Sequence, residues 1–234
     1  MPFTEKKLVE DYILEKLAEK GWKFVPAEEL ERDSLEEPLL IPNLIRALQK
    51  INKSAGIADD EIHKVLNELK LAPTGSEGSK KVLNFYRFGA PVKFEKEKVV
   101  KYIRLFDFEN AQNNEFIATR QAYFKGRDII RTDIVLYVNG IPLVDIECKD
   151  PTKISESWLN AFNQIKDYER IVPEFYKYAQ IGVAAESIAR YFPIVPWQED
   201  VNTYEWREKG KDSIDSAIEM LSPGVLLDII HNYL

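Results

Sequence analysis

The sequence predicts an α/β or α+β fold in which a mixed central β-sheet is flanked by helices. Three observations lead to this prediction: helical spacing of apolar residues in the first third, an apolar hairpin in the middle, and a helical segment followed by another apolar run. The chain has 234 residues, 45% of them hydrophobic, which is enough for one substantial core or for one core with a small addition.

The first third of the chain predicts helices. In residues 5–20 the apolar side chains recur at helical spacing, and Gly21 follows where a helix commonly ends. Residues 34–53 and 59–71 predict two more helices, and the second begins with acidic residues, which the helix dipole favours at that end. We therefore expect residues 1–80 to form a helical part that packs on the core.

Strands are predicted to follow this helical part. Residues 72–79 predict a loop, and residues 82–108 shift towards a strand pattern, most clearly in "VVKYIRLFDF". A turn-rich segment, "ENAQNNEF", then precedes "FIATRQAYF", which predicts another strand. These strands open the expected core, residues 81–192.

The core is predicted to close with a helix and a strand. The segment "SESWLNAFNQIKDYERIV" has the pattern of an amphipathic helix with Ser155 as its candidate N-cap, and "YKYAQIGVAAE" predicts one more strand. The remaining residues, 193–234, predict a tail in which a loop with Trp and Pro residues precedes a last helix at 223–234.

The hairpin in the middle, "RTDIVLYVNGIPLVDIECKD", has two possible registers. A two-residue turn at Asn139 and Gly140 would place Asp133 and Glu147 on opposite faces. A three-residue loop with a bulge at Gly140 places these two carboxylates on the same face. We predict the bulged register, because it gathers apolar residues alone on the other face: Ile134, Leu136, Val138, Pro142, Val144, Ile146 and Cys148.

The face opposite this apolar one carries a chemical pattern. Asp133, Glu147 and Lys149 point the same way there, beside Ile141 and Leu143. Two carboxylates can hold a hard cation such as Mg²⁺, and a nearby lysine can orient a nucleophile or stabilise charge on a phosphate. The alternative is a solvated ion pair at a sheet end, worth under ~1 kcal/mol.

Composition limits the possible functions. One cysteine and two histidines exclude an internal disulfide and a cysteine-built zinc site, and they argue against a histidine-rich metal centre. The N-terminus lacks a signal peptide's apolar block and no run approaches roughly 18 apolar residues, so we expect a cytoplasmic protein that does not cross a membrane. The net charge of −7 argues against a free-standing nucleic-acid binder.

The hairpin and its surroundings resemble a known family. "RTDIVLYVNGIPLVDIECKDP" is similar to the nuclease motif of the R (restriction) subunit of type I restriction endonucleases, in the PD-(D/E)xK superfamily. Thr132 and Asp150 stand where the family commonly has proline and asparagine, and neither change removes a metal ligand. "YIRLFDFENAQNNEFIATRQAYFKG" also resembles the segment that precedes the motif, and the likeness is good over residues 100–190.

The resemblance implies a restriction-endonuclease-like core and a role for each matching residue. Asp133 and Glu147 would ligate Mg²⁺, the backbone carbonyl of Cys148 would add a ligand, and Lys149 would be the catalytic lysine. A glutamate on the first helix often supports the metal site in this superfamily, and Glu10 is the candidate here. The alternative for Glu10 is an ordinary exposed helix carboxylate.

A second motif of the family, QxxxY, is matched by "NAFNQIKDYER". Gln164 and Tyr168 are four residues apart, so they share one helical face. The resemblance implies that they help to position the DNA strand or the catalytic residues. In isolation the same spacing also fits an amphipathic helix with a half-buried Tyr168. Cys148, by contrast, is predicted to be a small buried hydrophobe rather than a reactive thiol.

The resemblance also implies a function and partners. R subunits cleave double-stranded DNA without sequence preference of their own, after their motor domains have translocated it, while methyltransferase and specificity subunits choose the target. This chain lacks a Walker A pattern, so ATP would act only in a full-length subunit, towards whose motor domain residues 193–234 would lead. We expect a fragment or a naturally short nuclease domain. The alternatives are another PD-(D/E)xK repair or junction nuclease, or a non-catalytic docking module.

Two further groups of side chains bear on DNA binding. A set of aromatic residues predicts core and sheet surface rather than platforms for stacked bases: Tyr102, Phe106, Phe108, Tyr123 and Phe124. A run of basic residues could line a DNA path or, with Glu95 and Glu97 among them, form a solvated mixed face. The run comprises Lys80, Lys81, Arg87, Lys93, Lys96, Lys98, Lys101 and Arg104.

Overall fold

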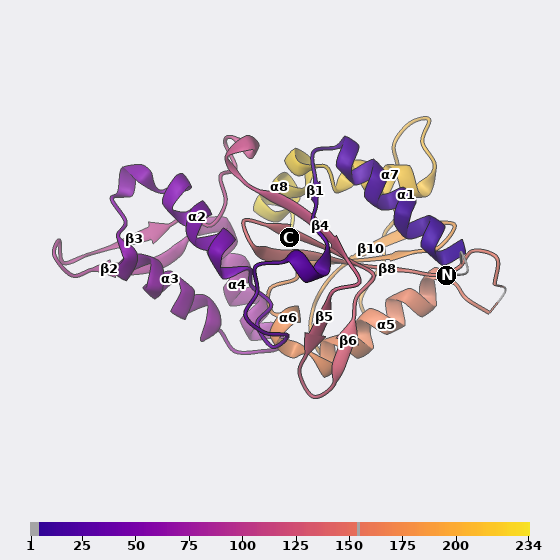
Figure 1. The fold of residues 1–234 in the computed structure, drawn as a ribbon, viewed down its shortest axis with the longest axis horizontal. Helices are drawn as coiled ribbons and strands as arrows, with labels where there is room; N and C mark the ends of the chain where they lie inside the picture. Colours follow the sequence, from indigo (N-terminus) through magenta and orange to yellow (C-terminus); the bar gives the residue numbers. More distant parts are fainter. Residues whose placement is uncertain (1–4, 154) are drawn as a thin grey trace.

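A six-stranded mixed β-sheet forms the centre of the computed structural model, which describes residues 5–153 and 155–234 (Figure 1). The strand order is β1-β4-β7-β8-β9-β10; β1 pairs with β4 and β8 with β9 in parallel, and the other neighbours are antiparallel. The mixed sheet expected from the sequence is therefore confirmed. Its strands are β1 (Lys23–Phe24), β4 (Phe116–Arg120), β7 (Ile134–Val138), β8 (Ile141–Cys148), β9 (Ile181–Ala185) and β10 (Ala189–Pro193).

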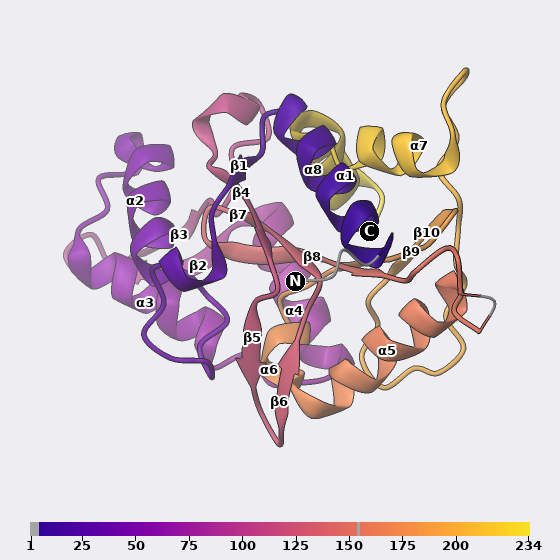
Figure 2. The ribbon, with the colours of Figure 1, turned by 45° about the vertical axis from the view of Figure 1, so that its right-hand side comes forward.

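Helices cover both faces of this sheet. Buried side chains of one face, such as Leu136 and Ile146, pack in one core with α1, α7 and α8, while Val135 and Tyr137 of the other face pack with α5 and α6. In Figures 1 and 2 the first group lies above the sheet and the second below it. The bounds are α1 (Glu5–Glu19), α5 (Trp158–Ile171), α6 (Pro173–Tyr176), α7 (Ser213–Met220) and α8 (Pro223–Asn232).

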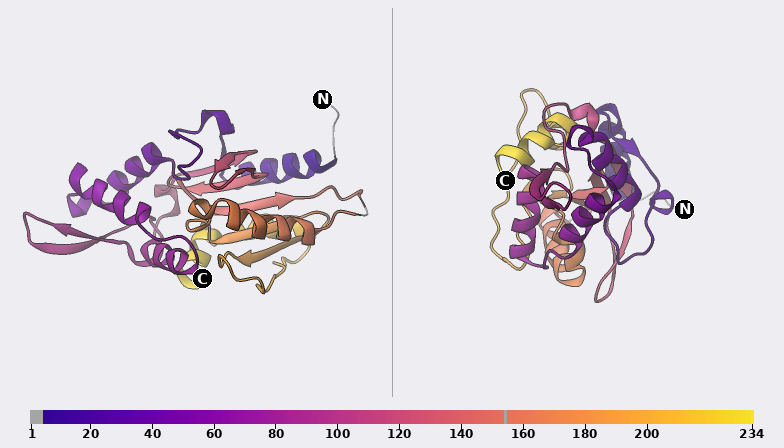
Figure 3. Two further views of the ribbon diagram at one scale, coloured as in Figure 1. Left: turned by 90° about the horizontal axis from the view of Figure 1, so that it is seen from below. Right: turned by 90° about the vertical axis from the view of Figure 1, so that its left-hand side faces the viewer.

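The remaining helices lie beside one end of the sheet with a long hairpin. In Figure 3 the β2–β3 hairpin projects from the body of the molecule, next to α2 and α3. No helix in the described part of the chain is both long and apolar enough to span a membrane. These elements are α2 (Ile41–Ile51), α3 (Asp59–Lys70), α4 (Ser76–Phe88), β2 (Ala90–Phe94) and β3 (Val99–Ile103), with short 3₁₀ turns at Ala27–Glu29, Lys53–Ala55 and Ala111–Asn113.

Several element boundaries differ from the predicted ones. The helix expected at 34–53 begins only at Ile41, because Pro42 suits the first turn of a helix and not its interior. The loop expected at 72–79 is helical from Ser76, and the helix continues to Phe88 where a strand pattern was expected, since its apolar face packs into the core.

The N-cap of α5 is also different from the predicted one. Ser157, not Ser155, precedes the first helical residue, and its backbone amide donates a hydrogen bond to Asn160 Oδ1 at 2.8 Å. This contact is the reciprocal half of a capping box, which satisfies a backbone donor at the start of the helix. Two elements near the C-terminus, β10 and α7, were not predicted at all.

The predicted three-residue loop of the β7–β8 hairpin is wrong, but Asp133 and Glu147 share a face as predicted. Val138 pairs with Ile141, so Asn139 and Gly140 form a two-residue turn with φ of 52° and 78°. The bulge lies further along, where Leu143 is the extra residue, and Ile141 and Leu143 face the large core instead of the carboxylates. Because Ile134 pairs with Ile146, the next residues of the two strands, Asp133 and Glu147, still share a face.

The tight turn of this hairpin is anchored by two other segments. Asn139 Nδ2 donates to the carbonyl of Leu105 at 2.8 Å and to Asn114 Oδ1 at 2.9 Å. The backbone amide of Leu40 donates to the carbonyl of Gly140 at 2.8 Å, and a Cβ on Gly140 would come within 2.4 Å of the Leu40 carbonyl oxygen. Glycine is therefore required here by both its positive φ and the close approach of backbone.

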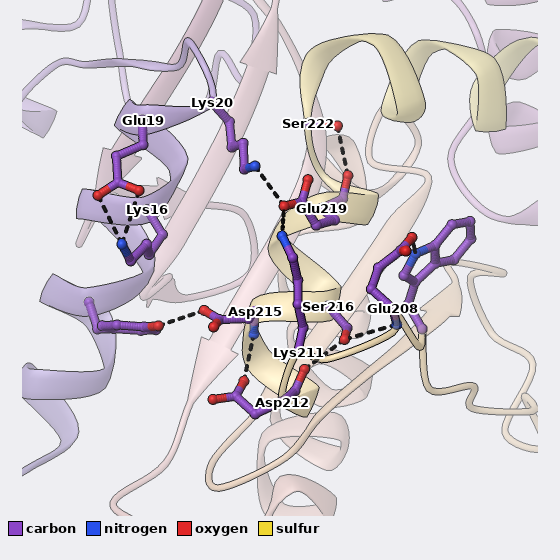
Figure 4. A network of polar contacts seen from close by, with 12 residues as sticks. Lys16, Glu19, Lys20, Glu208, Lys211, Asp212, Asp215, Ser216, Glu219 and Ser222 are labelled. Carbon is purple, nitrogen blue, oxygen red and sulfur yellow. Dashed lines mark hydrogen bonds and ion pairs between the residues drawn. The ribbon is translucent and has the colours of Figure 1, made fainter.

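Polar contacts fix α1 against α7 on the sheet face opposite α5 and α6. Tyr12 donates to Asp215 Oδ1 at 2.5 Å, and Lys20 forms an ion pair with Glu219 at 2.6 Å (Figure 4). The hydrogen bond to Asp215 and the charge of that carboxylate raise the pKa of Tyr12 to about 12. Since Ile13 and Leu17 of α1 are buried in the core, the helix is held on two sides.

Candidate active site

Two carboxylates come together where β8 ends and β7 begins. Asp133 and Glu147 are both buried, with 1% and 0% of their surface exposed. The backbone amide of Asp133 donates to Glu147 Oε1 at 3.1 Å, and the backbone amide of Cys148 donates to Asp133 Oδ2 at 2.8 Å. Each carboxylate is thus held by an amide of the neighbouring strand. Cys148 itself is buried in the core on the opposite face, as predicted.

The helix α5 adds its own side chains to this pair. Gln164 Nε2 donates to Glu147 Oε2 at 2.6 Å and to the Tyr168 hydroxyl at 2.8 Å. Gln164 Oε1 accepts a hydrogen bond from Lys149 Nζ. The structure therefore brings Asp133, Glu147, Lys149, Gln164 and Tyr168 into one connected set of hydrogen bonds.

Tyr168 closes this set on the strand side. Its hydroxyl donates to the carbonyl of Arg131 at 3.2 Å, two residues before Asp133. Partial burial, together with the negative charge of Glu147, raises the pKa of Tyr168 to about 12. The phenol is therefore neutral near pH 7, where it can donate one hydrogen bond and accept another.

Glu10, the candidate on the first helix, is connected to this set through one intervening residue. It is buried, in contrast to the exposed carboxylate of the alternative interpretation. Gln121 links it to the site: its side chain donates to Glu10 Oε2 at 3.3 Å, and its backbone amide donates to the carbonyl of Asp133 at 2.9 Å. Sequence reasoning missed Gln121, whose φ of 53° marks the break between β4 and the next strand.

Sequence reasoning also gave no role to Asp145 and its partner Tyr176. Asp145 is fully buried on the same face as Glu147, and Tyr176 donates to its Oδ2 at 2.5 Å. Burial raises the pKa of Asp145 to about 7, against the opposing effect of the Tyr176 hydrogen bond. The alternation of β8 puts Asp145 on the carboxylate face, but Tyr176 is 31 positions further along and no local pattern connects the two.

A second buried charged pair lies on the inner side of α5. Lys166 and Glu169 are one helical turn apart and form an ion pair at 2.6 Å. Burial raises the pKa of Glu169 to about 7, although the hydrogen bond and charge of Lys166 act in the other direction. The Lys166 ammonium group also lies 3.5 Å from the carbonyl of Val195, so the pair belongs to the packing of α5 against the following loop.

The donor set fits a hard divalent cation. Mg²⁺ is commonly bound by one or two carboxylates with water completing the shell, and Asp133 and Glu147 supply two carboxylates on one face. Among residues 5–153 and 155–234, this site included, no group of three or more His, Cys, Asp and Glu side chains is placed to hold a metal. A cation at this position would be held by these two carboxylates, by backbone carbonyls such as that of Cys148, and by water.

The basic run beyond residue 80 forms a mixed surface. Lys93 pairs with Glu95 at 3.1 Å and Lys101 with Glu97 at 2.8 Å, both on the β2–β3 hairpin. Farther back, Arg87 Nε donates to the carbonyl of His231 at 2.9 Å. Of the aromatic residues expected in core or sheet surface, Phe106 and Phe124 are buried, while Tyr102 and Tyr123 are exposed.

Comparison with known proteins shows which family this sequence resembles. Residues 2–201 match the sequence model of the type I restriction enzyme R protein N terminus. A putative type I restriction enzyme MjaVIIIP endonuclease subunit of Methanocaldococcus jannaschii is 30% identical over 242 residues, covering 100% of this chain and 23% of the relative. The HindI endonuclease subunit of Haemophilus influenzae is 28% identical over 251 residues, covering 96% and 23%. The chain thus spans under a quarter of these relatives.

Proposed function

The chain belongs to the family of type I restriction enzyme R protein N termini, and we propose that it is the Mg²⁺-dependent DNA-cleaving part of such an enzyme. Its relatives are described as endonuclease subunits. The single observation that supports this function best is the connected set of hydrogen bonds from Asp133 to Tyr168. It joins residues from two strands and a helix around a pair of buried carboxylates.

In this proposal Asp133 and Glu147 hold the cation. A bound Mg²⁺ supplies Lewis acidity: it raises the acidity of water and neutralises charge that builds on a phosphate. Asp133 and Glu147 are buried, so bulk solvent screens them little and their attraction to a cation is stronger. The Cys148 carbonyl would add a ligand, and Glu10 would support the site through Gln121.

Lys149 and α5 act on the reacting groups. The Lys149 ammonium group, half-buried beside Gln164, is a compact positive charge that can orient an attacking water and stabilise charge on the phosphate in the transition state. Gln164 holds Lys149 and Glu147 at once, so it positions both groups. Tyr168, neutral near pH 7, fixes Gln164 from the other side.

Target choice and DNA delivery belong to other parts of the enzyme in this proposal. The chain itself is acidic, with a net charge of −7, and would cut double-stranded DNA without intrinsic sequence preference. Motor domains of the same subunit would use ATP to translocate the DNA. Methyltransferase and specificity subunits would select the site, and the assembled enzyme would act in the cytoplasm.

The test uses a complete type I complex whose R subunit carries this sequence. We expect Glu147→Ala and Lys149→Ala to lower cleavage of an unmethylated plasmid by at least about 100-fold, because each removes a group that acts in the transition state. ATP hydrolysis and translocation should continue. Glu95→Ala, on the exposed β2–β3 hairpin, is the matched control and should cut normally.

The outcomes separate the proposal from its alternatives. If both site variants still cut, the catalytic assignment is wrong and a docking module becomes the better interpretation. If the isolated chain cuts branched DNA in preference to linear duplex, a repair or junction nuclease is favoured instead. Loss of cutting together with loss of ATP hydrolysis would indicate a disturbed complex rather than a disabled site.

A further inference from the structure

A two-stranded ribbon leaves the sheet directly beside the proposed cation site. Strands β5 (Tyr123–Lys125) and β6 (Ile129–Arg131) continue β4 and β7 past the point where the carboxylates lie (Figure 2). The backbone amide of Thr132 donates to the carbonyl of Ala122 at 3.0 Å, which carries the pairing across the junction. The last residue of the ribbon is therefore two positions before Asp133.

The inner side of the ribbon is fixed to the body of the protein. Phe124 and Ile130 are buried, and the ring of Phe124 lies 4.4 Å from that of Phe175. The backbone amide of Arg127, at the tip, donates to the carbonyl of Ile171 at 2.9 Å. The ribbon is held at both its root and its tip, so it presents a defined surface.

The outer side of the ribbon is exposed and basic. Tyr123 lies opposite Arg131 in the pairing, and both side chains are exposed. Between residues 120 and 131 the chain has four basic residues and one acidic residue, Asp128, in a protein whose net charge is −7. Arg120 and Lys125 have acidic partners, but in the part of the chain that the structure describes Arg127 and Arg131 form no ion pair.

A groove lies at the root of the same ribbon. It encloses about 610 Å³ and lies between the ribbon and the segment around β1, with Phe24, Glu28, Arg32, Arg120, Gln121 and Tyr123 among its lining residues. Phe24 and Tyr123 expose 44% and 46% of their surface. Gln121 lines the groove, and its backbone amide donates to the carbonyl of Asp133, so this residue connects the groove with the carboxylate pair.

We propose that this outer face, with the groove at its root, binds the backbone of the DNA duplex on one side of the phosphate that is cut. Arginines without acidic partners suit phosphate oxygens, and the outer face of the ribbon presents two of them. The exposed Tyr123 and Phe24 can contact phosphate or sugar of the duplex backbone beside the arginines. The inference rests on the proposed function and adds to it the surface that positions the substrate.

The β2–β3 hairpin offers a matched surface for comparison. It is a second exposed two-stranded hairpin, and Figure 3 shows it projecting from the end of the molecule. Its exposed Lys96 and Lys98 likewise have no ion pair among the described residues. Removing two positive charges from either hairpin changes the net charge equally, so a difference between them reports position rather than charge.

The experiment measures binding without cutting. The protein is titrated against a fluorescently labelled duplex in Ca²⁺, over a series of salt concentrations, and fluorescence anisotropy gives the affinity. We expect the double variant Arg127→Ala with Arg131→Ala to bind about 10-fold or more weakly, and its slope of log affinity against log salt to fall by about 2, one per lost phosphate contact. Lys96→Ala with Lys98→Ala should match the wild type.

Further variants make each outcome decisive. Arg127→Lys with Arg131→Lys keeps both charges and should restore the slope, and unfolding temperatures check that exposed substitutions leave the fold intact. The proposal is wrong if the two double alanine variants lower the affinity equally, or if Lys96→Ala with Lys98→Ala lowers it more than Arg127→Ala with Arg131→Ala. It is also wrong if the wild type shows no salt-dependent binding. The cleavage assays on Glu147→Ala and Lys149→Ala test the nuclease function separately. If Arg127→Ala with Arg131→Ala binds DNA like the wild type, only the proposal that the ribbon binds DNA is wrong.

Discussion

The backbone amide of Asp133 donates to a carboxylate oxygen of Glu147 at 3.1 Å, although the two residues lie on different strands of a hairpin. The amide of Cys148 completes the exchange by donating to Asp133. Two ionised carboxylates on neighbouring strands repel each other, and a cation bound between them would relieve that repulsion. The backbone of the hairpin therefore holds the acidic pair in place, and a cation would bind into an arrangement that already exists.

The first prediction is that Glu147→Gln weakens binding of Mn²⁺, used as a probe for Mg²⁺, by at least about 10-fold. The substitution keeps the shape of the side chain but removes one of the two negative charges. Isothermal titration calorimetry on the 234-residue protein measures the change, and Glu95→Gln, with 63% of its side chain exposed, is the control. Unchanged Mn²⁺ affinity in Glu147→Gln would place the metal elsewhere. The unfolding temperature checks that the variant is folded, because the glutamine amide can accept from only one of the two donors that Glu147 now satisfies.

A second prediction concerns Gln164, which contacts Glu147 and Lys149 at once. We expect Gln164→Leu to lower DNA cleavage by about 10–100-fold, the range typical when a side chain that orients a metal ligand is removed. Cleavage by the complete complex is the measurement. Asn163→Leu, at the exposed position just before Gln164 in α5, should cut like the wild type. If both leucine variants lost activity equally, the effect would come from α5 as a whole and not from the contacts of Gln164.

The fold class was predictable because the spacing of apolar residues along the sequence distinguishes helices from strands, even where it does not give their exact ends. The apolar runs around Asn139 and the helical spacing of α1 and α5 are both visible in the sequence. The position of the bulge was not predictable from the residues alone. Leu143 and Val144 are both apolar and both are buried in the large core, so their pattern does not show which of them is the extra residue of the bulge.

The candidate site was predictable only in part, for a related reason. Asp133 and Glu147 follow from strand alternation, and the convergence of the two strands needs nothing beyond the hairpin. Gln121 and Tyr176 contact this region through tertiary packing, and no spacing rule connects them with their partners. The start of α4 at Ser76 was missed likewise, since its helix is stabilised by packing on the core rather than by local propensity.

The third prediction compares two glycines with similar backbone conformations. Gly140 and Gly210 have φ of 78° and 81°, but an added Cβ meets the Leu40 carbonyl at 2.4 Å in the first case and nothing within 4 Å in the second. Gly210→Ala should cost about 1 kcal/mol of unfolding free energy for the left-handed conformation. Gly140→Ala should cost about 1–3 kcal/mol more for the clash.

Thermal unfolding of the two variants measures this difference. For a chain of this size each kcal/mol corresponds to roughly 2–4 °C in the unfolding temperature. Because both variants share the cost of a positive φ, subtracting one from the other isolates the close approach of Leu40 to the turn. Equal losses for Gly140→Ala and Gly210→Ala would mean that this segment moves aside freely, and the turn would then not be anchored as described.

The last prediction is a pH dependence of stability that comes from Glu169. Burial raises its pKa in the folded protein to about 7, above its ordinary value of 4.5. Between these values the folded state holds a proton that the unfolded state has released, so the stability contributed by Glu169 falls as pH rises. The contribution is fully present below about pH 4.5 and is lost as the pH passes 7. Because a glutamine amide does not titrate, Glu169→Gln should gain on the wild type by about 2–3 kcal/mol as the pH rises between these limits.

Denaturant unfolding at several pH values tests this. Glu169→Gln and the wild type share every other titrating group, so the difference between their unfolding free energies isolates Glu169. Asp167→Asn, two positions away with 69% of its side chain exposed, is the control, and its difference from the wild type should stay within about 0.5 kcal/mol across the range. A Glu169→Gln difference that is flat with pH would mean that Lys166, at 2.6 Å, offsets the cost of burying the carboxylate in full. A difference of opposite sign, with the wild type gaining on the variant as pH rises, would mean that the ion pair stabilises the charged form beyond what water does.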